Sequence, residues 1–329
     1  MGVFAYRKHL LEKGTPGWIA AAVLGVLEDF SAFLDGAGKA ESAAGMPEAQ
    51  QFARRLIADG RNTKENFSTL RDYAAFSGNR PLYVAWIELM DCHGALDVLA
   101  GEIESRHGRK TREAVFADPR PPLGADEIER CAYTRGLTER MAARLDLAQR
   151  REVWFPVRHG IPAERWKAGD AADREKFLRC GDIDSFLELK RRERDALLTG
   201  LRDRNELWYT VEITDEVLEF VRSDPEMEGG RREGEKIFIT KIPYNAERYL
   251  RETDPVRKRY WACHCPMVRQ AILDGRPISA EICHCSLGHA SHYLAGLGCE
   301  LRGEVLESVL AGDPRCRFVF RLPEGFASS

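Results

Sequence analysis

Residues 300–322, ELRGEVLESVLAGDPRCRFVFRL, decide the fold class of this chain. Glu300–Leu310 and Arg315–Leu322 alternate apolar and polar side chains, and the residues AGDP lie between them. Alternation with a period of two is typical of a strand with one buried face, and glycine and proline favour a turn. The stretch therefore predicts an antiparallel pair of strands with one face in solvent.

The pattern from about residue 205 onward mixes strands and helices. Leu207–Ile213 is rich in β-favouring side chains, and Lys236–Pro243 alternates like a strand. The rest of this part predicts short helices at 214–222 and 245–251, a loop at 228–234 and a strand at 259–263. We therefore expect residues 205–329 to form an α+β domain, with an antiparallel sheet covered by helices on one face.

The residues before 205 predict one helix after another, because their apolar side chains recur at helical spacing. The expected helices cover about 18–27, 47–59, 63–77, 80–106, 125–147 and 171–200. Asp35–Pro47, rich in glycine and alanine, and the proline-rich Asp118–Gly124 interrupt this pattern. We expect residues 1–204 to form an all-helical domain.

Composition narrows the class of protein. The 329 residues are 44% hydrophobic and 31% charged, with a net charge of -3, which is typical of a globular protein. Such a balance gives no overall field for binding nucleic acid or anionic lipid. The apolar run Trp18–Leu27 is too short to cross a bilayer, and no A-x-A-like cleavage site follows it. We expect a cytoplasmic protein without nucleic-acid or membrane partners, and homodimer formation is left open.

The nine cysteines are too few for a disulfide scaffold, and they stay reduced in the cytoplasm. Cys92, Cys131 and Cys180 lie in helical patterns, where a free cysteine behaves as a small buried hydrophobe. Cys299 and Cys316 lie near the terminal hairpin. The other four form two clusters of identical pattern.

These clusters are Cys263-His264-Cys265, followed by Pro266, and Cys283-His284-Cys285, followed by Ser286. Proline is favoured at the first helical position and serine at a helix cap, so each cluster is expected where a strand ends and a helix begins. On extended backbone, residues two apart point the same way, so the cysteines would face one point with both histidines turned away. A helix N-terminus would also lower the pKa of the thiols.

Four thiolates that converge in this way could hold a metal ion. Tetrahedral sulfur ligation suits Zn²⁺, and an iron ion or an iron–sulfur centre is the alternative. Glu304 and Glu307 lie between Cys299 and Cys316, so a mixed sulfur and carboxylate site is a further option. Reactive cysteines without metal, and inert packing, are the competing interpretations.

The terminal residues resemble a known type of domain. Cys283–Pro323 contains GHASHYLAG, then ESVLAGD, then CRFVFRLP. This ending resembles the 4-vinyl-reductase-type small-molecule-binding domain, which occurs in phenol-responsive bacterial regulators and is related to a subunit family of the TRAPP vesicle-transport complexes. The CHCP and CHCS clusters also look like a bacterial family of unassigned function related to L-2-amino-thiazoline-4-carboxylic acid hydrolase. The resemblance covers about residues 205–323 and implies an α+β domain with a small-molecule pocket.

The resemblance also implies metal ligands. In the phenol-responsive relatives, zinc is held by a cysteine before the GHAS-like turn, a later glutamate, and two cysteines around the last hairpin. Cys283 and Cys316 match the first and last of these cysteines, whereas Ser308 replaces the middle one. Val305 replaces the glutamate, and Glu304 is one position away. The metal set we expect is therefore completed by the clusters and comprises Cys263, Cys265, Cys283, Cys285 and Cys316.

Three functional hypotheses follow. The first is a zinc- and small-molecule-binding protein that acts as a hydrolase on a C–N or C–S bond through metal-bound water, with His264, His284 or Glu304 as proton carriers. The second is an enzyme with a thiolate nucleophile at Cys283 or Cys285. The third is a ligand-sensing or scaffold module with a structural metal, in which the helical N-terminal part signals to a protein partner.

Overall fold

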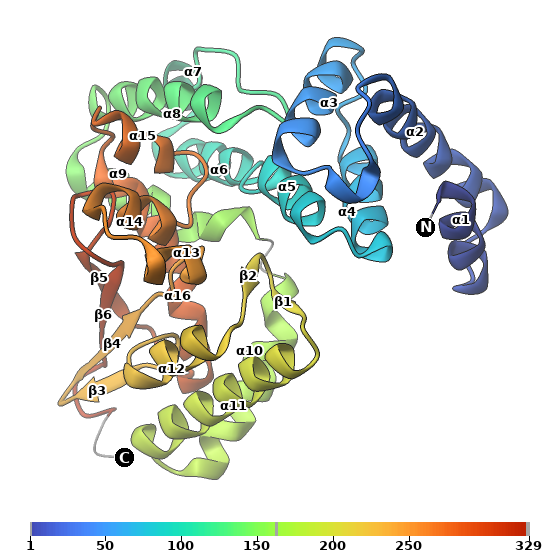
Figure 1. Cartoon of the computed structure of the whole chain (residues 1–329). Coiled ribbons are helices and arrows are strands. Elements are labelled where there is room, and N and C mark those ends of the chain that lie inside the picture. The colour runs from blue at the N-terminus through green and yellow to red at the C-terminus, as the bar shows by residue number, and fades with distance from the viewer. Residues whose placement is uncertain (1, 162–163, 327–329) are drawn as a thin grey trace. The chain divides into compact units, whose positions relative to one another are not determined.

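The computed structural model describes residues 2–161 and 164–326, and the fold is α+β. The chain separates into two compact units (Figure 1). The first unit comprises the described residues up to His93 together with Arg120–Arg130. The second comprises Gly94–Pro119 and the described residues from Cys131 onward.

The first unit is helical. Its elements are α1 (Val3–Glu12), α2 (Gly17–Gly36), η1 (Glu41–Ala43), α3 (Met46–Ala58), α4 (Lys64–Ser77), α5 (Arg80–Met90) and the start of α8 (Glu127–Ala142). Trp86 is fully buried at the centre of the core, where the rings of Phe30 and Phe67 meet it edge-on at centroid distances of 5.6 and 5.7 Å. Among the described residues, no helix combines the length and the apolar character needed to cross a membrane.

The second unit contains both sheets and the remaining helices. Its helices are α6 (Ala95–His107), α7 (Arg109–Val115), most of α8, α9 (Leu147–Trp154), η2 (Phe155–Gly160), α10 (Glu164–Cys180), α11 (Ile183–Asp203), α12 (Asp215–Ser223), α13 (Ala246–Arg251), α14 (Pro255–Ala262), α15 (Arg269–Asp274), η3 (Ala280–Cys283), α16 (His284–Ala290) and η4 (Ser291–Leu297). Its strands are β1 (Leu207–Trp208), β2 (Val211–Glu212), β3 (Arg231–Glu233), β4 (Lys236–Thr240), β5 (Arg302–Glu307) and β6 (Arg317–Arg321).

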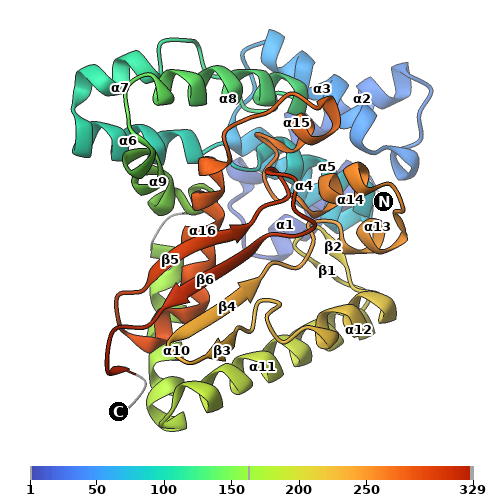
Figure 2. The ribbon, with the colours of Figure 1, turned by 90° about the vertical axis from the view of Figure 1, so that its left-hand side faces the viewer.

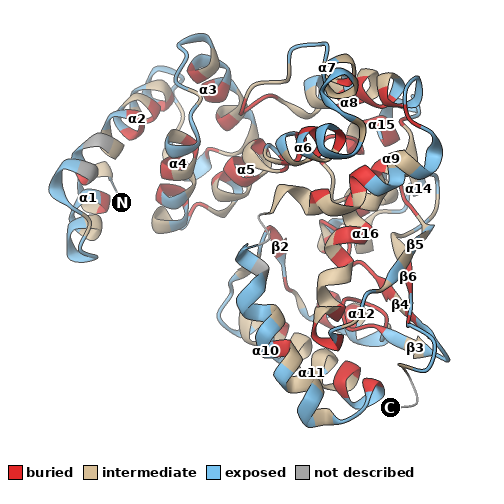
Figure 3. Cartoon of the chain, turned by 180° about the vertical axis from the view of Figure 1, so that it is seen from behind, coloured by how far each residue is buried: buried red, intermediate tan, exposed pale blue. Residues whose placement is uncertain are grey.

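The main sheet is antiparallel, with the strand order β3-β4-β6-β5 (Figure 2). In its central pair Ile237 lies opposite Phe320 and Ile239 opposite Phe318, so these four side chains share one face. That face packs against α11, α16 and η4 and is fully buried (Figure 3). Burial of each such side chain stabilises the fold by about 1.5 to 3 kcal/mol, which is why the helices cover this face.

The sequence predicted several of these elements and misplaced others, among them the helix expected at 171–200, which is broken between α10 and α11. The terminal hairpin is confirmed as β5 and β6, and the helices on one face of an antiparallel sheet are confirmed as well. The strand expected at 259–263 is wrong, because Asp254 caps a helix there: its carboxylate accepts a hydrogen bond from the Arg257 N–H at 2.8 Å. The single helix expected at 80–106 is also wrong, because it is broken at Cys92, whose φ is +58°.

The boundary predicted between residues 204 and 205 falls inside the second unit. Ile183, Phe186 and Leu187 of α11 pack against the apolar face of the sheet, so this helix belongs to the same core as the strands. A helix and the sheet that it covers cannot be separated without exposing that core. The helical part of the sequence is therefore shared between both units.

We expect Gly288→Ala to destabilise the second unit strongly. A Cβ atom at Gly288 of α16 would overlap the backbone carbonyl oxygen of Phe155 in η2, and backbone cannot yield as a flexible side chain does. Overpacking of this kind costs about 3 kcal/mol, which urea unfolding measures. Gly101→Ala in α6 is the control, since nothing lies within 4 Å of its Cβ position; it should stabilise by about 0.5 to 1 kcal/mol. Equal effects would contradict the close approach of α16 and η2.

Candidate metal centre and adjoining cavity

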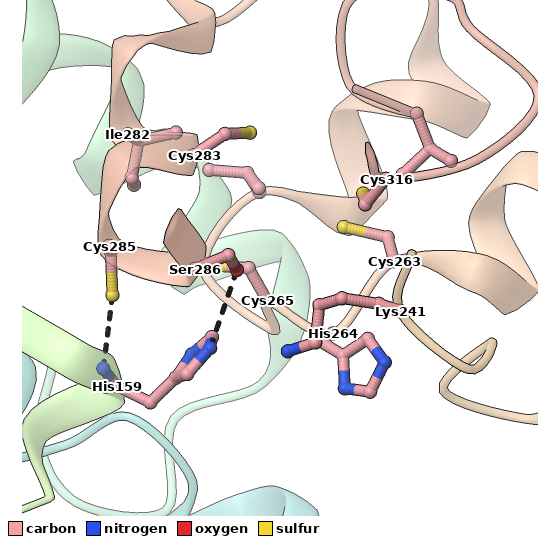
Figure 4. A pocket seen from close by; sticks show the side chains of 12 residues that line it. His159, Lys241, Cys263, His264, Cys265, Ile282, Cys283, Cys285, Ser286 and Cys316 are labelled. Carbon is pink, nitrogen blue, oxygen red and sulfur yellow. Dashed lines mark hydrogen bonds between the residues drawn. The ribbon is translucent and has the colours of Figure 1, made fainter. Parts of the chain in front are cut away.

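Five of the nine cysteines line one small cavity of the second unit (Figure 4). Cys263 and Cys265 lie in the connection between α14 and α15, Cys283 ends η3, and Cys285 lies in α16. Cys316 directly precedes β6. The complete lining is His159, Lys241, Cys263, His264, Cys265, Val268, Ile282, Cys283, Cys285, Ser286, Val309 and Cys316. We call this cavity the thiol cavity.

The sulfurs influence one another. Burial raises the pKa of the Cys263 thiol well above its usual range, and the neighbouring thiols of Cys265, Cys316 and Cys283 raise it further. Burial likewise raises the pKa of Cys283, with Cys316 as the next cause. Burial and mutual repulsion both favour the protonated form, so the thiols of Cys263 and Cys283 keep their protons when no metal ion lies among them.

Two of the sulfurs have hydrogen-bond partners. The Cys285 Sγ accepts a bond from the backbone N–H of His159 at 3.0 Å. The Cys283 Sγ lies 3.1 Å from the hydroxyl of Ser308. Ser308 is the position at which the resemblance implies a zinc-binding cysteine, and the structure brings its side chain next to Cys283.

The lining of the thiol cavity also carries nitrogen and oxygen atoms, which come from the side chains of His159, Lys241, His264 and Ser286. We call these four residues the nitrogen side. The His264 Nε2 lies 2.7 Å from the carbonyl oxygen of Ile242 and must donate to it, which leaves Nδ1 as an acceptor. Burial, and next the charge of Lys241, hold the pKa of His264 well below its usual range, so its ring is neutral.

Lys241 is only 6% exposed. It follows β4, and its backbone N–H donates to the carbonyl oxygen of Cys316 at 3.0 Å. Within the described parts of the chain, its ammonium makes no hydrogen bond and no close ion pair. The acid that it influences is Glu228, which has a φ of +51° and a buried side chain. Burial raises the pKa of Glu228 to about 7, although Lys241 and the Tyr293 hydroxyl act to lower it.

The volume of the thiol cavity is about 20 Å³, close to the space of one water molecule. As the side chains are placed, the described residues include no group of three or more His, Cys, Asp or Glu side chains that could hold a metal ion. The structure therefore gathers the predicted sulfurs around one small space without converging them on a point.

A larger cavity of about 270 Å³ adjoins the thiol cavity and shares Lys241 and Cys316 with it. Its walls mix aromatic and apolar side chains with polar ones: Phe220, Ser223, Asp224, Met227, Thr240, Lys241, Pro243, Tyr249, Ala262, Pro314, Arg315 and Cys316. Arg315 is already paired with Glu307 through two contacts of 3.1 Å. We call this space the side cavity, and its mixed lining is typical of small-molecule pockets.

Several predicted site residues lie elsewhere. Glu304 of β5 is exposed and lies 3.4 Å from Arg321, and it does not line the thiol cavity. The His284 Nδ1 lies 3.1 Å from the carbonyl oxygen of Glu281, and this ring does not line it either. Cys299 packs against the core of the sheet, and Glu307 is paired with Arg315.

The local geometry of the clusters also differs from the prediction. Cys263 follows the C-terminal end of α14 rather than a strand, and η3 runs directly into α16 at Cys283. The chain turns at Cys265, whose carbonyl oxygen accepts two backbone hydrogen bonds, so His264 lines the cavity instead of facing away. The expected lowering of the thiol pKa is wrong for Cys283, because burial outweighs any effect of the short helix.

Sequence reasoning missed Lys241, Glu228 and His159. The signal for Lys241 was present: the period of two in Lys236–Pro243 places it on the same face as Ile237 and Ile239, and a lysine on a core face is unusual. His159 lies far from the clusters in sequence, and its place in the cavity depends on η2 packing against α16. No local pattern reveals that contact.

No family model, curated protein or solved structure matches this chain. The chemistry of the site must therefore be inferred from its own residues.

We expect Glu226→Gln to lower the free energy of unfolding and to make that free energy depend less on pH in the acid range. Glu226 is 4% exposed and binds Arg317 through two bonds of 2.7 and 2.8 Å, which fixes the segment that carries Met227 and Glu228. Burial alone would raise the pKa of Glu226, but Arg317 and Thr240 lower it overall. The carboxylate thus stabilises the fold above the unfolded-state pKa, and this contribution is lost as the pH falls through the lower folded-state value.

Urea unfolding between pH 3 and 7 measures this effect; the wild-type loss of stability towards low pH should shrink in Glu226→Gln, with about 3 kcal/mol lost at neutral pH. Glu304→Gln is the matched control, because Glu304 makes an exposed contact with Arg321 and should change stability by less than about 0.5 kcal/mol. The same pH slope in both variants would contradict a special role for Glu226.

Proposed function

We propose that the thiol cavity binds one transition metal ion, Zn²⁺ in the first place, and that the side cavity binds a small molecule next to it. The observation that supports this most is the gathering of five thiols from separate segments around a space that suits one ion. Thiolate sulfur is the ligand type that zinc and iron prefer, whereas calcium and magnesium prefer oxygen. Iron is the alternative metal.

The electrostatics of the cysteines favour a cation. Their thiols are buried and raise the pKa of one another. A divalent ion among them would replace protons and offset the repulsion between thiolates. Binding of a metal would require these side chains to rotate, because the Cys283 thiol is hydrogen-bonded to the Ser308 hydroxyl and the Cys285 thiol to the backbone N–H of His159. Rotation between staggered rotamers needs no movement of the backbone.

A hydrolase is the activity that this arrangement supports best. Lys241 and His264 lie on the same lining as the sulfurs, so a water molecule beside the metal would be within their reach once the side-chain rotation has widened the cavity. The metal would supply Lewis acidity toward that water or a substrate atom. His264 would take a proton at Nδ1, since its Nε2 donates to Ile242. The resemblance to the thiazoline-carboxylic acid hydrolase family favours a C–N or C–S bond as the target.

The two competing functions are less well supported. A thiolate nucleophile at Cys283 conflicts with its raised pKa, because burial keeps the proton on the thiol. A sensor with a structural metal would have four protein ligands and no open position. The number of protein ligands therefore distinguishes the hydrolase from the sensor.

We expect the full-length chain, purified under reducing conditions, to carry about one equivalent of zinc or iron. Elemental analysis measures this, and Cys263→Ser and Cys316→Ser should reduce the metal content by at least about tenfold because each removes a thiolate ligand. Cys180→Ser is the control, since Cys180 in α10 does not line the cavity. The metal content should also fall as the pH is lowered, because protons compete for the thiolates. A wild-type chain without metal after zinc addition would overturn the proposal.

We expect Ser308→Cys to bind zinc more tightly than the wild type. The new thiol would lie beside Cys283, where the hydroxyl is now 3.1 Å away. X-ray absorption at the zinc edge should show three sulfurs and one oxygen or nitrogen in the wild type and one more sulfur in the variant. Ser291→Cys is the control, because its hydroxyl donates to Gly288 and lies outside the cavity lining. Four sulfur ligands in the wild type would contradict the hydrolase and support the sensor with a structural metal.

A further inference from the structure

The most exposed large apolar side chains among the described residues lie on the first two helices. Phe4 of α1 is 80% exposed, and Trp18, the second residue of α2, is 75% exposed. Leu11, on the last turn of α1, is 45% exposed. Single apolar side chains on a surface need no explanation, whereas a group of them in one short segment indicates a contact surface.

The helix α1 is apolar on two of its faces. Val3, Tyr6 and Leu10 form the first face, which packs against the core of the first unit. Phe4 and Leu11 are two helical turns apart, so they lie almost directly in line on another face. That second face is in solvent, and Figure 3 shows exposed residues along α1. The described residues therefore use only one of the two apolar faces.

Basic side chains flank the exposed apolar line. Arg7 and Lys8 of α1 lie on either side of it, and Lys13 follows the helix. All three are exposed. The only acidic residue in the sequence from 2 to 18 is Glu12, which lies 3.7 Å from Lys8. This segment is therefore positive, although the whole chain has a net charge of -3. We call its exposed apolar and basic side chains the α1 surface: Phe4, Arg7, Lys8, Leu11, Lys13 and Trp18.

The composition of the α1 surface decides which partner fits it. A two-fold contact with a second copy would place the same basic side chains opposite one another, where like charges repel. An acidic surface pairs with them instead. Exposed aromatic rings with flanking lysine and arginine are typical of segments at a lipid–water interface, where the rings enter the headgroup region and the basic side chains reach anionic headgroups. Charge and apolar character thus both fit anionic lipid.

We propose that the α1 surface binds an anionic phospholipid bilayer, with its aromatic side chains among the headgroups and no segment crossing the membrane. The overall charge of the chain does not reveal this site, because the attraction acts only over about a Debye length. The proposal goes beyond the proposed function and does not depend on it, since the α1 surface belongs to the first unit and the thiol cavity to the second.

Co-sedimentation of the full-length chain with vesicles measures this binding. The affinity for vesicles of phosphatidylcholine and phosphatidylserine in equal parts should exceed that for phosphatidylcholine alone by at least about tenfold, because each basic side chain near an anionic surface adds to the attraction. Added salt should weaken the binding to the mixed vesicles, since it screens exposed charges.

The double variant Phe4→Ser/Trp18→Ser should bind the mixed vesicles at least about tenfold more weakly, because two apolar side chains no longer leave water. Both side chains are exposed, so the fold should be unchanged. Ile128→Ser is the matched control in the same unit. Ile128 of α8 is 64% exposed but lies between Glu127 and Glu129, so its loss should leave the affinity unchanged.

Fluorescence distinguishes insertion of the rings from attraction by charge alone. Bromine on the acyl chains of the mixed vesicles should quench the fluorescence of Trp18. Trp18→Phe should bind as tightly as the wild type and lose this quenching, because the ring is kept and the indole is removed.

Several outcomes would overturn lipid binding: no binding to the mixed vesicles, equal binding to both kinds of vesicle, unchanged binding of the double variant, or quenching that persists in Trp18→Phe. A wild-type dimer that the double variant converts to monomers in sedimentation equilibrium would also overturn it, because a second copy would then cover the α1 surface. None of these results depends on the metal content, so lipid binding and the proposed function can fail separately.

Discussion

The antiparallel pairing of β4 with β6 is the interaction on which the candidate site depends. The ladder continues one step beyond the strands, where the Lys241 N–H donates to the carbonyl oxygen of Cys316 at 3.0 Å. This bond holds the buried cation and one of the five sulfurs next to each other. A slip of one residue would turn Ile237 and Ile239 away from the helices, and it would move Lys241 out of the cavity. The same apolar contacts that stabilise the sheet therefore fix the position of its one buried lysine.

Strained backbone completes the site from two other segments. His159 and Glu228 have φ values of +60° and +51°, in the left-handed region that favours glycine. Such a residue costs roughly 1 to 3 kcal/mol, so its surroundings must hold it there. The Cys285 Sγ accepts the His159 N–H, and the Thr240 carbonyl oxygen accepts the Glu228 N–H at 3.0 Å. His159 therefore lies against α16 at the thiol cavity, and Glu228 is held beside Thr240, which lines the side cavity.

The sequence predicted what depends on local pattern and missed what depends on distant contacts. Alternation in the terminal hairpin was enough to predict β5 and β6, and the repeated Cys-His-Cys pattern pointed to Cys263 and Cys283 as neighbours, which line one cavity. The backbone conformation before the first cluster could not be predicted from local sequence, because the cap formed by Asp254 starts a helix in residues whose pattern resembles a strand. The place of His159 depends on the absence of a side chain at Gly288, which lets two backbones meet.

Charge balance links a metal ion in the thiol cavity to Lys241, which lies on the same lining. A divalent ion adds two positive charges, and each thiol that becomes a thiolate adds one negative charge. Two thiolates leave the local charge unchanged, whereas three or four make it more negative, and the Lys241 ammonium would offset that charge. A metal held by many sulfurs would thus use Lys241 as its own counter-charge, and a metal held by fewer would leave it for a ligand. The number of thiolates therefore decides whether the metal keeps an open coordination position and whether Lys241 can bind a ligand.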